Sequence, residues 1–432
     1  MSAPIVEIRH LLQHVGQTVT LRGWVRNART SKIRFIELRD GSGYVQCVCG
    51  PNDAEPESYE RAGKLTQECA ITVTGTVQTH PRSGAPELLV KSLDLVGDSV
   101  DYPITPKEHG TAFLMEHRHL WLRSKRQWAI LRIRHTLVKA IRDFFDGDGF
   151  TLLDAPILTP SACEGTSTLF GTPYFDEGTA YLSQSGQLYQ EPGLAAFGKT
   201  YCFGPTFRAE KSKTRRHLTE FWMVEPEMAF AHLDDVMVLG ERLVKFMLQR
   251  VLEDRQEELK ILERDLAPLE QALSATFARM TYTEAVAKLK ELGSDINWGE
   301  DFGNDDETIL MNAMDRPLWV HRFPKVFKAF YMEPDPEDPK LALGADLLAP
   351  EGYGEVIGGG ERASSLQYLL DQIAHEGLDE KDYKWYLDVR RYGSVPHAGF
   401  GLGLERAVAW ICKLAHVRET APYPRMMGTL WP

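Results

Sequence analysis

Apolar and polar residues alternate with a period of two over five segments in the first hundred residues, and β-branched residues are frequent in these segments. Such alternation predicts strands that are buried on one face. The predicted strands are residues 18–27, 33–39, 44–49, 70–79 and 88–96. Between the third and the fourth, residues 54–64 are polar and have helical character.

The order strand, strand, strand, helix, strand, strand predicts an OB-fold, a small five-stranded barrel. Residues 97–110 contain Pro103 and Pro106 and little apolar periodicity, so a domain boundary is expected there. From residue 121 to 145 apolar residues recur at helical spacing, and a Gly-Asp-Gly sequence ends the helix. We therefore divide the chain into an OB-fold domain (1–100), a linker (101–120) and a second domain (121–432).

The second domain mixes strands and helices without the regular alternation of a doubly wound sheet, which predicts an α+β fold class. Strands are predicted at residues 150–153, 181–182, 199–208, 220–230, 319–321, 329–332 and 353–358, and a Gly-rich helix start at 399–411. The segment from about residue 235 to 292 is heavily charged. We interpret it as a helical insertion at the surface.

Composition narrows the class of protein. Of 432 residues, 43% are apolar and 25% are charged, which is ordinary for a globular chain. No stretch of about 18 uncharged apolar residues occurs, and the first ten residues lack the apolar run of a signal peptide, so we expect a cytoplasmic protein. The six cysteines form no C-x-x-C pair and no Cys/His cluster. Neither zinc nor a disulfide framework is expected.

The net charge of −12 repels polyanions at long range, so nucleic-acid binding must depend on local patches. Two segments are basic. Residues 22–39 carry six Lys or Arg residues against Glu37, and residues 207–217 carry five against Glu210. A solvated surface is the alternative interpretation for either patch taken alone.

The first basic patch coincides with the second and third predicted strands, which in OB-folds commonly present a nucleic-acid face. Phe35 and Gln46 lie on these strands. An aromatic ring can stack on an unpaired base, and an amide can read the edge of that base. The alternative is that Phe35 belongs to the barrel core and Gln46 is merely exposed.

Common nucleotide and hydrolase motifs are absent: there is no Walker A sequence, no G-x-G-x-x-G opening a helix after a strand, no G-x-S-x-G and no H-E-x-x-H. The prominent segment is instead 203–230, a strand, a loop rich in cations and a strand with alternating acids. A basic loop between two antiparallel strands suits a polyphosphate held over a sheet, because arginine forks match phosphate oxygens.

This segment resembles motif 2 of the class II aminoacyl-tRNA synthetases. GFGLGLERAVAWI (399–411) is similar to their motif 3, and the helix before GFTLLDAPILTP, with Pro156, resembles motif 1, which forms the dimer interface in that family. With the OB-fold, the resemblance indicates the aspartate, asparagine and lysine subgroup and covers nearly the whole chain. It implies an anticodon-binding barrel, a class II catalytic domain with an antiparallel sheet flanked by helices, and a homodimer.

The resemblance implies ATP-dependent activation of an amino acid and transfer to the 3′ end of tRNA. The substrate carboxylate is already ionised at pH 7, so alignment and charge stabilisation suffice for its attack on the α-phosphorus. By resemblance, Arg208 contacts the α-phosphate and the substrate carboxylate, Arg406 holds the γ-phosphate, and Glu355 carries Mg²⁺ with Asp346 as a candidate second acid. For both acids a solvated loop position is the alternative. The implied ATP-binding residues are Arg208, Glu210, Arg216, His217, Leu218, Phe221, Glu355, Gly403 and Arg406.

Three positions predict which amino acid is activated. In the aspartate enzymes, the motif resembling residues 185–190 ends in a lysine that pairs with the substrate side chain, and here this position is Gln190. Where those enzymes have an aspartate after motif 2, this chain has Glu225, whose extra methylene brings an acceptor nearer to a substrate amide. Arg362 remains as a donor to the amide oxygen. One acceptor and one donor match asparagine, and tRNA(Asn) is the expected partner.

Further roles are carried over by resemblance. Ser185 and Gln187 hold the amino and carboxylate groups, and Glu164 closes over the amine from a lid-like loop. The implied amino-acid-binding residues are Glu164, Ser185, Gln187, Gln190, Arg208, Glu225 and Arg362. By resemblance, Phe35 and Gln46 match positions that read the central anticodon base, with Arg29 nearby as a third anticodon residue, and the third base is expected to be read near residues 79–84. Relatives usually have a serine and a glutamine where this chain has Gly360 and Glu361, which leaves the support of Arg362 open.

Other functions remain open at this point. A non-discriminating aspartate enzyme would share the chemistry, but Gln190 and Glu225 argue against it. A tRNA-independent asparagine synthetase would share the catalytic domain, but the retained barrel argues against it. A lysine substrate would need further acids in the pocket. An inactive paralogue that binds amino acid or RNA as a regulator is expected to lose a motif arginine, yet Arg208 and Arg406 are both present.

Overall fold

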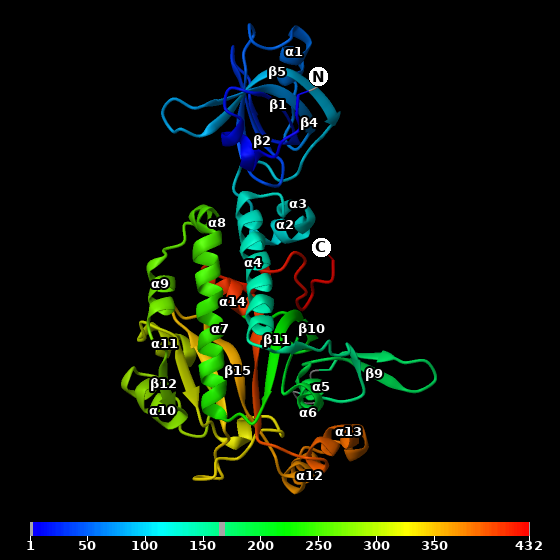
Figure 1. Ribbon diagram of the computed structural model, residues 1–432, viewed down its shortest axis with the longest axis vertical. Coiled ribbons are helices and arrows are strands. Elements are labelled where there is room, and N and C mark those ends of the chain that lie inside the picture. Colours follow the sequence, from blue (N-terminus) through cyan, green and yellow to red (C-terminus); the bar gives the residue numbers. More distant parts are fainter. Residues whose placement is uncertain (1–2, 164–168, 432) are drawn as a thin grey trace. The chain divides into compact units, whose positions relative to one another are not determined.

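The computed structural model describes residues 3–163 and 169–431. The chain forms two compact units, Met1–Gly110 and Thr111–Pro432, which are described separately below (Figure 1). The predicted linker at 101–120 is divided by this boundary, because α2 (Thr111–Glu116) and α3 (Arg118–Trp121) are helical and belong to the second unit.

The first unit is a closed five-stranded barrel with the strand order β1-β2-β3-β5-β4. Its strands are β1 (Thr18–Arg29), β2 (Arg34–Arg39), β3 (Tyr44–Cys49), β4 (Ala70–Thr79) and β5 (Pro86–Gly97), and α1 (Pro56–Ala62) lies between β3 and β4. Alternate residues such as Val19, Leu21, Ile36 and Leu38 are fully buried inside it. The predicted OB-fold is confirmed, because period-two alternation directly reports which side chains face the interior.

The second unit contains an eight-stranded sheet with the order β12-β13-β14-β15-β16-β11-β10-β6. The central pairs are antiparallel, and only the outer pairs β12 with β13 and β10 with β6 are parallel. The strands are β6 (Thr151–Leu152), β10 (Lys199–Phe207), β11 (Glu220–Ala229), β12 (Ala278–Thr281), β13 (Leu318–His321), β14 (Gly344–Ala349), β15 (Gly354–Arg362) and β16 (His397–Gly403). With the helices around it, this sheet confirms the α+β class.

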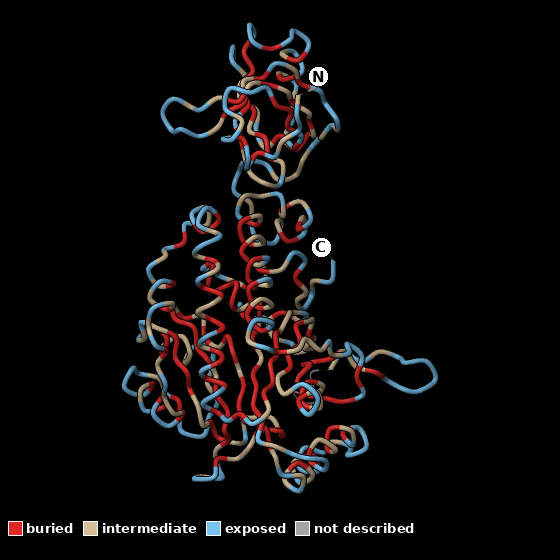
Figure 2. The backbone as a smooth tube through the Cα atoms, viewed as in Figure 1, coloured by how far each residue is buried: buried red, intermediate tan, exposed pale blue. Residues whose placement is uncertain are grey.

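Helices α4 (Lys125–Gly147), α7 (Leu233–Asp254) and α14 (Leu404–Ile411) form the main core with one face of the sheet (Figures 1 and 2). The interpretation of residues 235–292 as a surface insertion is wrong for α7. Its residues Val236, Leu243 and Val251 are completely buried against the sheet and α4. The charge of this segment lies on the outward face of an amphipathic helix, so charge density concealed the buried face.

The smaller elements complete the unit. A three-stranded sheet has the order β7-β9-β8, formed by β7 (Leu158–Thr159), β9 (Thr179–Leu182) and β8 (Gly171–Pro173). The remaining α-helices are α5 (Gln187–Gln190), α6 (Leu194–Phe197), α8 (Gln256–Ile261), α9 (Ala267–Ser274), α10 (Tyr282–Glu291), α11 (Asn304–Asn312), α12 (Leu366–His375) and α13 (Glu380–Arg391). No helix within the described ranges has the length and apolar character needed to cross a bilayer.

Several strand assignments differ from the prediction. Strands β7, β8 and β12 were not predicted, and β12 lies inside the segment 235–292 that was expected to be helical. Residues 329–332 form turns and one isolated bridge, from Met332 to Arg362, although their side chains are largely buried. Strand β14 was not predicted. It is a central strand between β13 and β15 whose residues are nearly all buried, and a buried strand lacks the alternation that marks a half-exposed one.

Candidate active site

The sheet face opposite the core helices carries the candidate site. Successive side chains of a strand point to opposite faces, and Val224, Phe400 and Leu402 are buried in the helix-covered core. Met223 and Gly401 therefore point to the other face, where they line a pocket. Gly403, also in β16, lines this pocket as well. A Cβ added to Gly403 would meet no atom within 4 Å, so the sheet is open at this point.

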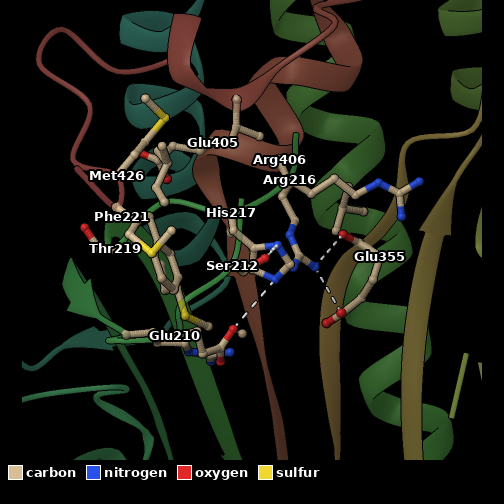
Figure 3. Close-up of a pocket in the computed structure, with 18 residues that line it drawn as sticks. Glu210, Ser212, Arg216, His217, Thr219, Phe221, Glu355, Glu405, Arg406 and Met426 are labelled. Atoms are coloured by element: carbon tan, nitrogen blue, oxygen red, sulfur yellow. Dashed lines mark hydrogen bonds and ion pairs between the residues drawn. The ribbon is translucent and has the colours of Figure 1, made fainter. Parts of the chain in front are cut away.

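The pocket is open to solvent and is formed by β11, β15, β16, the start of α14 and the basic loop between β10 and β11 (Figure 3). The lining residues are Arg208, Glu210, Ser212, Arg216, His217, Leu218, Thr219, Phe221, Met223, Glu355, Val356, Gly401, Gly403, Glu405, Arg406, Val417, Met426 and Met427. All nine residues predicted to bind ATP are among them.

Two arginines and one acid define the charge of the pocket. Arg406 Nη1 lies 3.0 Å from the backbone oxygen and 3.0 Å from Oε2 of Glu355 (Figure 3). Burial raises the pKa of Glu355, but Arg406 and Lys328 outweigh burial and hold the pKa below its ordinary value. The guanidinium of Arg208 lies 5.6 Å from the centre of the Phe221 ring. The pocket thus holds an ionised acid between cations, beside an aromatic surface.

The basic loop contributes His217 and Glu210, whose Nε2 and Oε2 atoms are 3.8 Å apart (Figure 3). His217 also contacts the hydroxyls of Ser212 and Thr214 through Nδ1. Burial, and then the charge of Arg406, lower the pKa of His217. A neutral imidazole is therefore favoured at pH 7, which leaves the fixed positive charge of the pocket to the arginines.

Asp346 and Glu355 are the two carboxylates that could hold a divalent cation. A Cβ added to Gly358 would lie 2.7 Å from Glu355 Oε1 and 3.5 Å from Asp346 Oδ1, so both acids converge on this glycine. Lys328 Nζ donates to Asp346 Oδ2 at 2.6 Å, and burial raises the pKa of Asp346 to about 6. Among the described residues no third His, Cys, Asp or Glu joins them in a metal-binding group. Two hard oxygen donors fit Mg²⁺ that takes its other ligands from phosphates and water.

The predicted amino-acid-binding residues Ser185 and Glu225 lie together and are almost fully buried. Ser185 Oγ donates to Glu225 Oε1, and Gly186 N donates to Oε2 at 2.8 Å. Cys202 Sγ is 3.4 Å from the same Oε2 atom. Burial raises the pKa of Glu225, while these donors oppose the rise. These donors hold the carboxylate of Glu225 in a set orientation.

Gln187 is anchored by a residue that the sequence analysis missed. Its Nε2 donates to Glu191 Oε1 at 3.1 Å, and Glu191 is completely buried. Arg390 Nη2 lies 2.7 Å, and His397 Nε2 2.8 Å, from Glu191 Oε2, and Tyr386 donates to Oε1 at 2.9 Å. Burial raises the pKa of Glu191, but Arg390 and His397 outweigh it and lower the pKa well below its ordinary value.

Gln190, another predicted amino-acid-binding residue, contacts the backbone instead of this group. Gln190 is completely buried, and its Nε2 donates to the backbone oxygen of Leu153 at 2.8 Å. Glu164 lies outside the described residues.

Arg362 is held by Glu227, the second buried acid of β11. Arg362 Nη2 lies 2.6 Å from Glu227 Oε1, and Nε lies 3.2 Å from both carboxylate oxygens. Arg362 is therefore held by an acid even though this chain has Gly360 and Glu361 where relatives usually have a serine and a glutamine. Glu361 instead accepts from Leu233 N at the start of α7, and a Cβ at Gly360 would lie 2.3 Å from the oxygen of Leu343. The alternating acids after motif 2 were the signal for Glu227.

The predicted anticodon residues lie on neighbouring strands of the barrel. Arg29 of β1 pairs in register with Phe35 of β2, and Phe35 is only partly buried. Gln46 of β3 is exposed as a residue, and its Nε2 donates to Glu87 Oε1 of β5 at 2.6 Å. Phe35 is thus not a barrel-core residue, and the amide NH₂ group of Gln46 already has an acidic partner.

Known families match both units. Residues 111–427 match the family described as "tRNA synthetases class II (D, K and N)", and residues 19–96 match "OB-fold nucleic acid binding domain". The chain is 57% identical to the "Asparagine--tRNA ligase" of Sorangium cellulosum, over 99% of both chains. It is 56% identical to that of Desulforamulus reducens, over 98% of this chain and 99% of the other.

Solved structures agree with these matches. The asparaginyl-tRNA synthetase of Pyrococcus horikoshii, complexed with asparaginyl-adenylate, has a TM-score of 0.95 and 44% identity over 99% of both chains. The enzyme of Entamoeba histolytica, also with asparaginyl-adenylate, has a TM-score of 0.90 and 31% identity over the full length of both. The chain therefore belongs to the asparaginyl-tRNA synthetases, within the class II tRNA synthetases of the aspartate, lysine and asparagine group.

Proposed function

We propose that this protein activates asparagine with ATP to asparaginyl-adenylate and transfers the asparaginyl group to the 3′ end of tRNA(Asn). The observation that carries the proposal is that one strand, β11, borders both the pocket proposed for ATP and the buried polar group proposed for the amino acid. Phe221 of β11 lines the phosphate-side pocket with Arg208, and Glu225 of the same strand lies in the buried polar group with Ser185. The substrate carboxylate can therefore meet the α-phosphate near Arg208.

The activation step needs no general base, because the attacking carboxylate is ionised. The carboxylate oxygen forms a bond to the α-phosphorus, and the bond to pyrophosphate breaks. Arg208 is proposed to neutralise the α-phosphate and orient the carboxylate, and Arg406 to bind the γ-phosphate. Phe221 is proposed to stack on adenine. Such preorganised charges act most strongly where charge accumulates in the transition state.

Selectivity for asparagine is proposed to follow from one acceptor and one donor. Glu225, oriented by Ser185 and Gly186, accepts from the amide NH₂ of the substrate. Arg362, oriented by Glu227, donates to the amide oxygen. Because Gln187 commits its Nε2 to Glu191, its Oε1 is available to accept from the substrate ammonium. An aspartate side chain would bring a second carboxylate to Glu225, and buried polar sites reject such mismatches strongly.

We propose that Mg²⁺ accompanies ATP at Glu355 and Asp346, which would hold it by their oxygens. When bound, the ion would offset negative charge on the phosphates. We also propose that Arg29, Phe35 and Gln46 contact the anticodon, that the segment resembling motif 1 forms a homodimer, and that the enzyme works in the cytoplasm. The partial exposure of Phe35 supports a stacking role.

ATP–pyrophosphate exchange on the purified protein with Mg²⁺ tests the proposal, with asparagine and aspartate compared side by side. Exchange with asparagine alone is expected. Exchange supported by aspartate and not by asparagine would keep the reaction and overturn the assignment of Glu225 and Arg362. ATP binding without adenylate formation from any amino acid would favour an inactive regulator.

A further inference from the structure

Arg216, at the end of the basic loop, is held by groups outside the pocket that it borders. Its Nη1 donates to Glu307 Oε2 and, at 3.2 Å, to Asn304 Oδ1. Its Nη2 donates to Thr308 Oγ1 at 3.0 Å and to the oxygen of Gly352 at 2.7 Å. Only 7% of the Arg216 side chain is exposed. Both Nη atoms, which carry four of the five guanidinium N–H donors, are thus engaged by α11 and the turn before β15.

Glu307 connects this arginine to a second part of the pocket. The Oε2 atom that accepts from Arg216 also accepts from the backbone N–H of Glu355 at 3.3 Å. A Cβ added to Gly354 would lie 2.0 Å from the same oxygen, so the glycine allows this close approach. Glu307 therefore joins the basic loop and the first residues of β15, two segments separated by more than a hundred residues.

The helix that carries Glu307 is firmly packed. Leu310 and Met311 of α11 are completely buried in a small core that includes α10 and β13. A side chain on a packed helix is a more precise support than one on a loop. The loop, in contrast, has the exposed residues Lys211, Lys213 and Arg215 on either side of its turn.

We infer that Glu307 is a positioning residue of the ATP site: it anchors the Arg216 guanidinium, and with it the loop that carries Arg208 and His217, at a set position beside Glu355. Arg216 is then an anchor of the nucleotide pocket and not a phosphate clamp, which refines its predicted role. Phosphate contacts through both Nη atoms would require it to leave three residues of α11. The inference rests on the proposed function of this pocket in binding ATP.

The test compares Glu307→Gln with the unmodified full-length protein. The substitution keeps the size of the side chain and replaces the carboxylate that accepts from Arg216 by an amide. We expect the KM for ATP to rise about tenfold, equivalent to about 1.4 kcal/mol, with the KM for asparagine changed by less than about twofold. Calorimetric ATP affinity without amino acid should fall by the same factor. Thr308→Val, which removes one contact to Arg216, should shift ATP affinity in the same direction by a smaller factor.

The neighbouring acid Asp306 supplies a matched control. It accepts from Gly303 N at 3.0 Å and from Ser294 Oγ at 2.7 Å, so it stabilises the start of α11 without contacting the basic loop. Asp306→Asn should lower the melting temperature and leave ATP affinity near that of the unmodified protein. A double variant Glu307→Gln/Arg216→Met should bind ATP no worse than the more impaired single variant, because both changes remove one interaction.

Several outcomes would overturn the inference. Tighter ATP binding by Glu307→Gln would mean that Glu307 competes with phosphate for Arg216. Equal losses for ATP and asparagine, or the same loss in Asp306→Asn, would reduce Glu307 to general support of the fold. Absence of exchange in the unmodified protein would overturn the proposed function, and the calorimetric ATP affinities would still decide the role of Glu307.

Discussion

The two ends of the candidate active site are built differently. At the ATP end, Arg208, Arg406 and Glu355 are partly exposed and line an open pocket. At the amino-acid end, Glu225 and Arg362 are almost completely buried, and each is held by partners from another element or loop. This difference in exposure matches the chemistry of the two proposed ligands, ATP and asparagine. A polyanion is attracted by accessible charge, whereas an uncharged amide is distinguished from a carboxylate only by groups whose hydrogen bonds are already oriented.

The largest effect on the buried end is expected when the side chain of Glu227 is removed. Glu227→Ala leaves Arg362 buried without its carboxylate, which costs about 3–5 kcal/mol in comparable pairs. We expect urea unfolding to show a loss of this size. Glu220→Ala, on an exposed position of the same strand, is the control and should change stability little. A loss below about 1 kcal/mol would show that the buried end tolerates disorder.

Removal of a charge at the open end should affect catalysis more than stability. Arg208→Ala is expected to slow ATP–pyrophosphate exchange by about 10²–10³-fold, or about 2.7–4 kcal/mol, as for other charge-stabilising contacts. Lys211→Ala, at an exposed position of the same loop, should leave the rate nearly unchanged. Near-normal exchange by Arg208→Ala would remove this arginine from the reaction.

A one-methylene change sharpens the specificity argument. Glu225→Asp withdraws the acceptor from the substrate amide and from Ser185 and Gly186. The kcat/KM for asparagine should fall by a factor equivalent to about 1.5–3 kcal/mol of transition-state stabilisation, which is the range for hydrogen bonds to charged groups. The KM for ATP should stay constant. Glu220→Asp makes the same substitution at the exposed start of β11. Equal effects of Glu225→Asp on both substrates would contradict the separation of the two ends.

The smallest of these effects is expected in the barrel. This prediction adds the surface proposed to bind tRNA to the comparison. Phe35→Ala should weaken tRNA charging by about 1–3 kcal/mol, the value of one base stacked on an aromatic ring. Exchange without tRNA should remain unchanged. Phe175→Ala removes a strongly exposed phenylalanine of the catalytic unit and serves as the control. If exchange falls together with charging, the division of labour between the two units is wrong.

The open end could be predicted to a large extent because it comes from short continuous motifs. The nine predicted ATP residues come from the basic hairpin, the start of β15 and the strand-to-helix turn at 403–406, and the structure gathers them in one pocket. In such motifs the local spacing along a strand or loop already decides which side chains share a face. The barrel strands were predictable for the same reason.

The buried end could be predicted only in part. Gln187, Glu225 and Arg362 were predicted by resemblance. The buried residues that hold Gln187 (Glu191, itself paired with Arg390) and Arg362 (Glu227) were not. Two of the carboxylates pair with residues more than a hundred positions away, and sequence spacing carries no information about such pairs. Burial of α7 was missed for a related reason, since a charged outer face dominated the composition of its segment.

The sequence alone therefore determined the family, the barrel and the α+β class, and it predicted a set of residues that the structure gathers in one pocket, because periodicity and contiguous motifs are local properties. Tertiary structure decided which charges are paired. Arg216 donates to Glu307, Arg362 to Glu227 and Gln187 to Glu191. A buried charge or amide needs a hydrogen-bond partner, and the tertiary structure decides which residue supplies it.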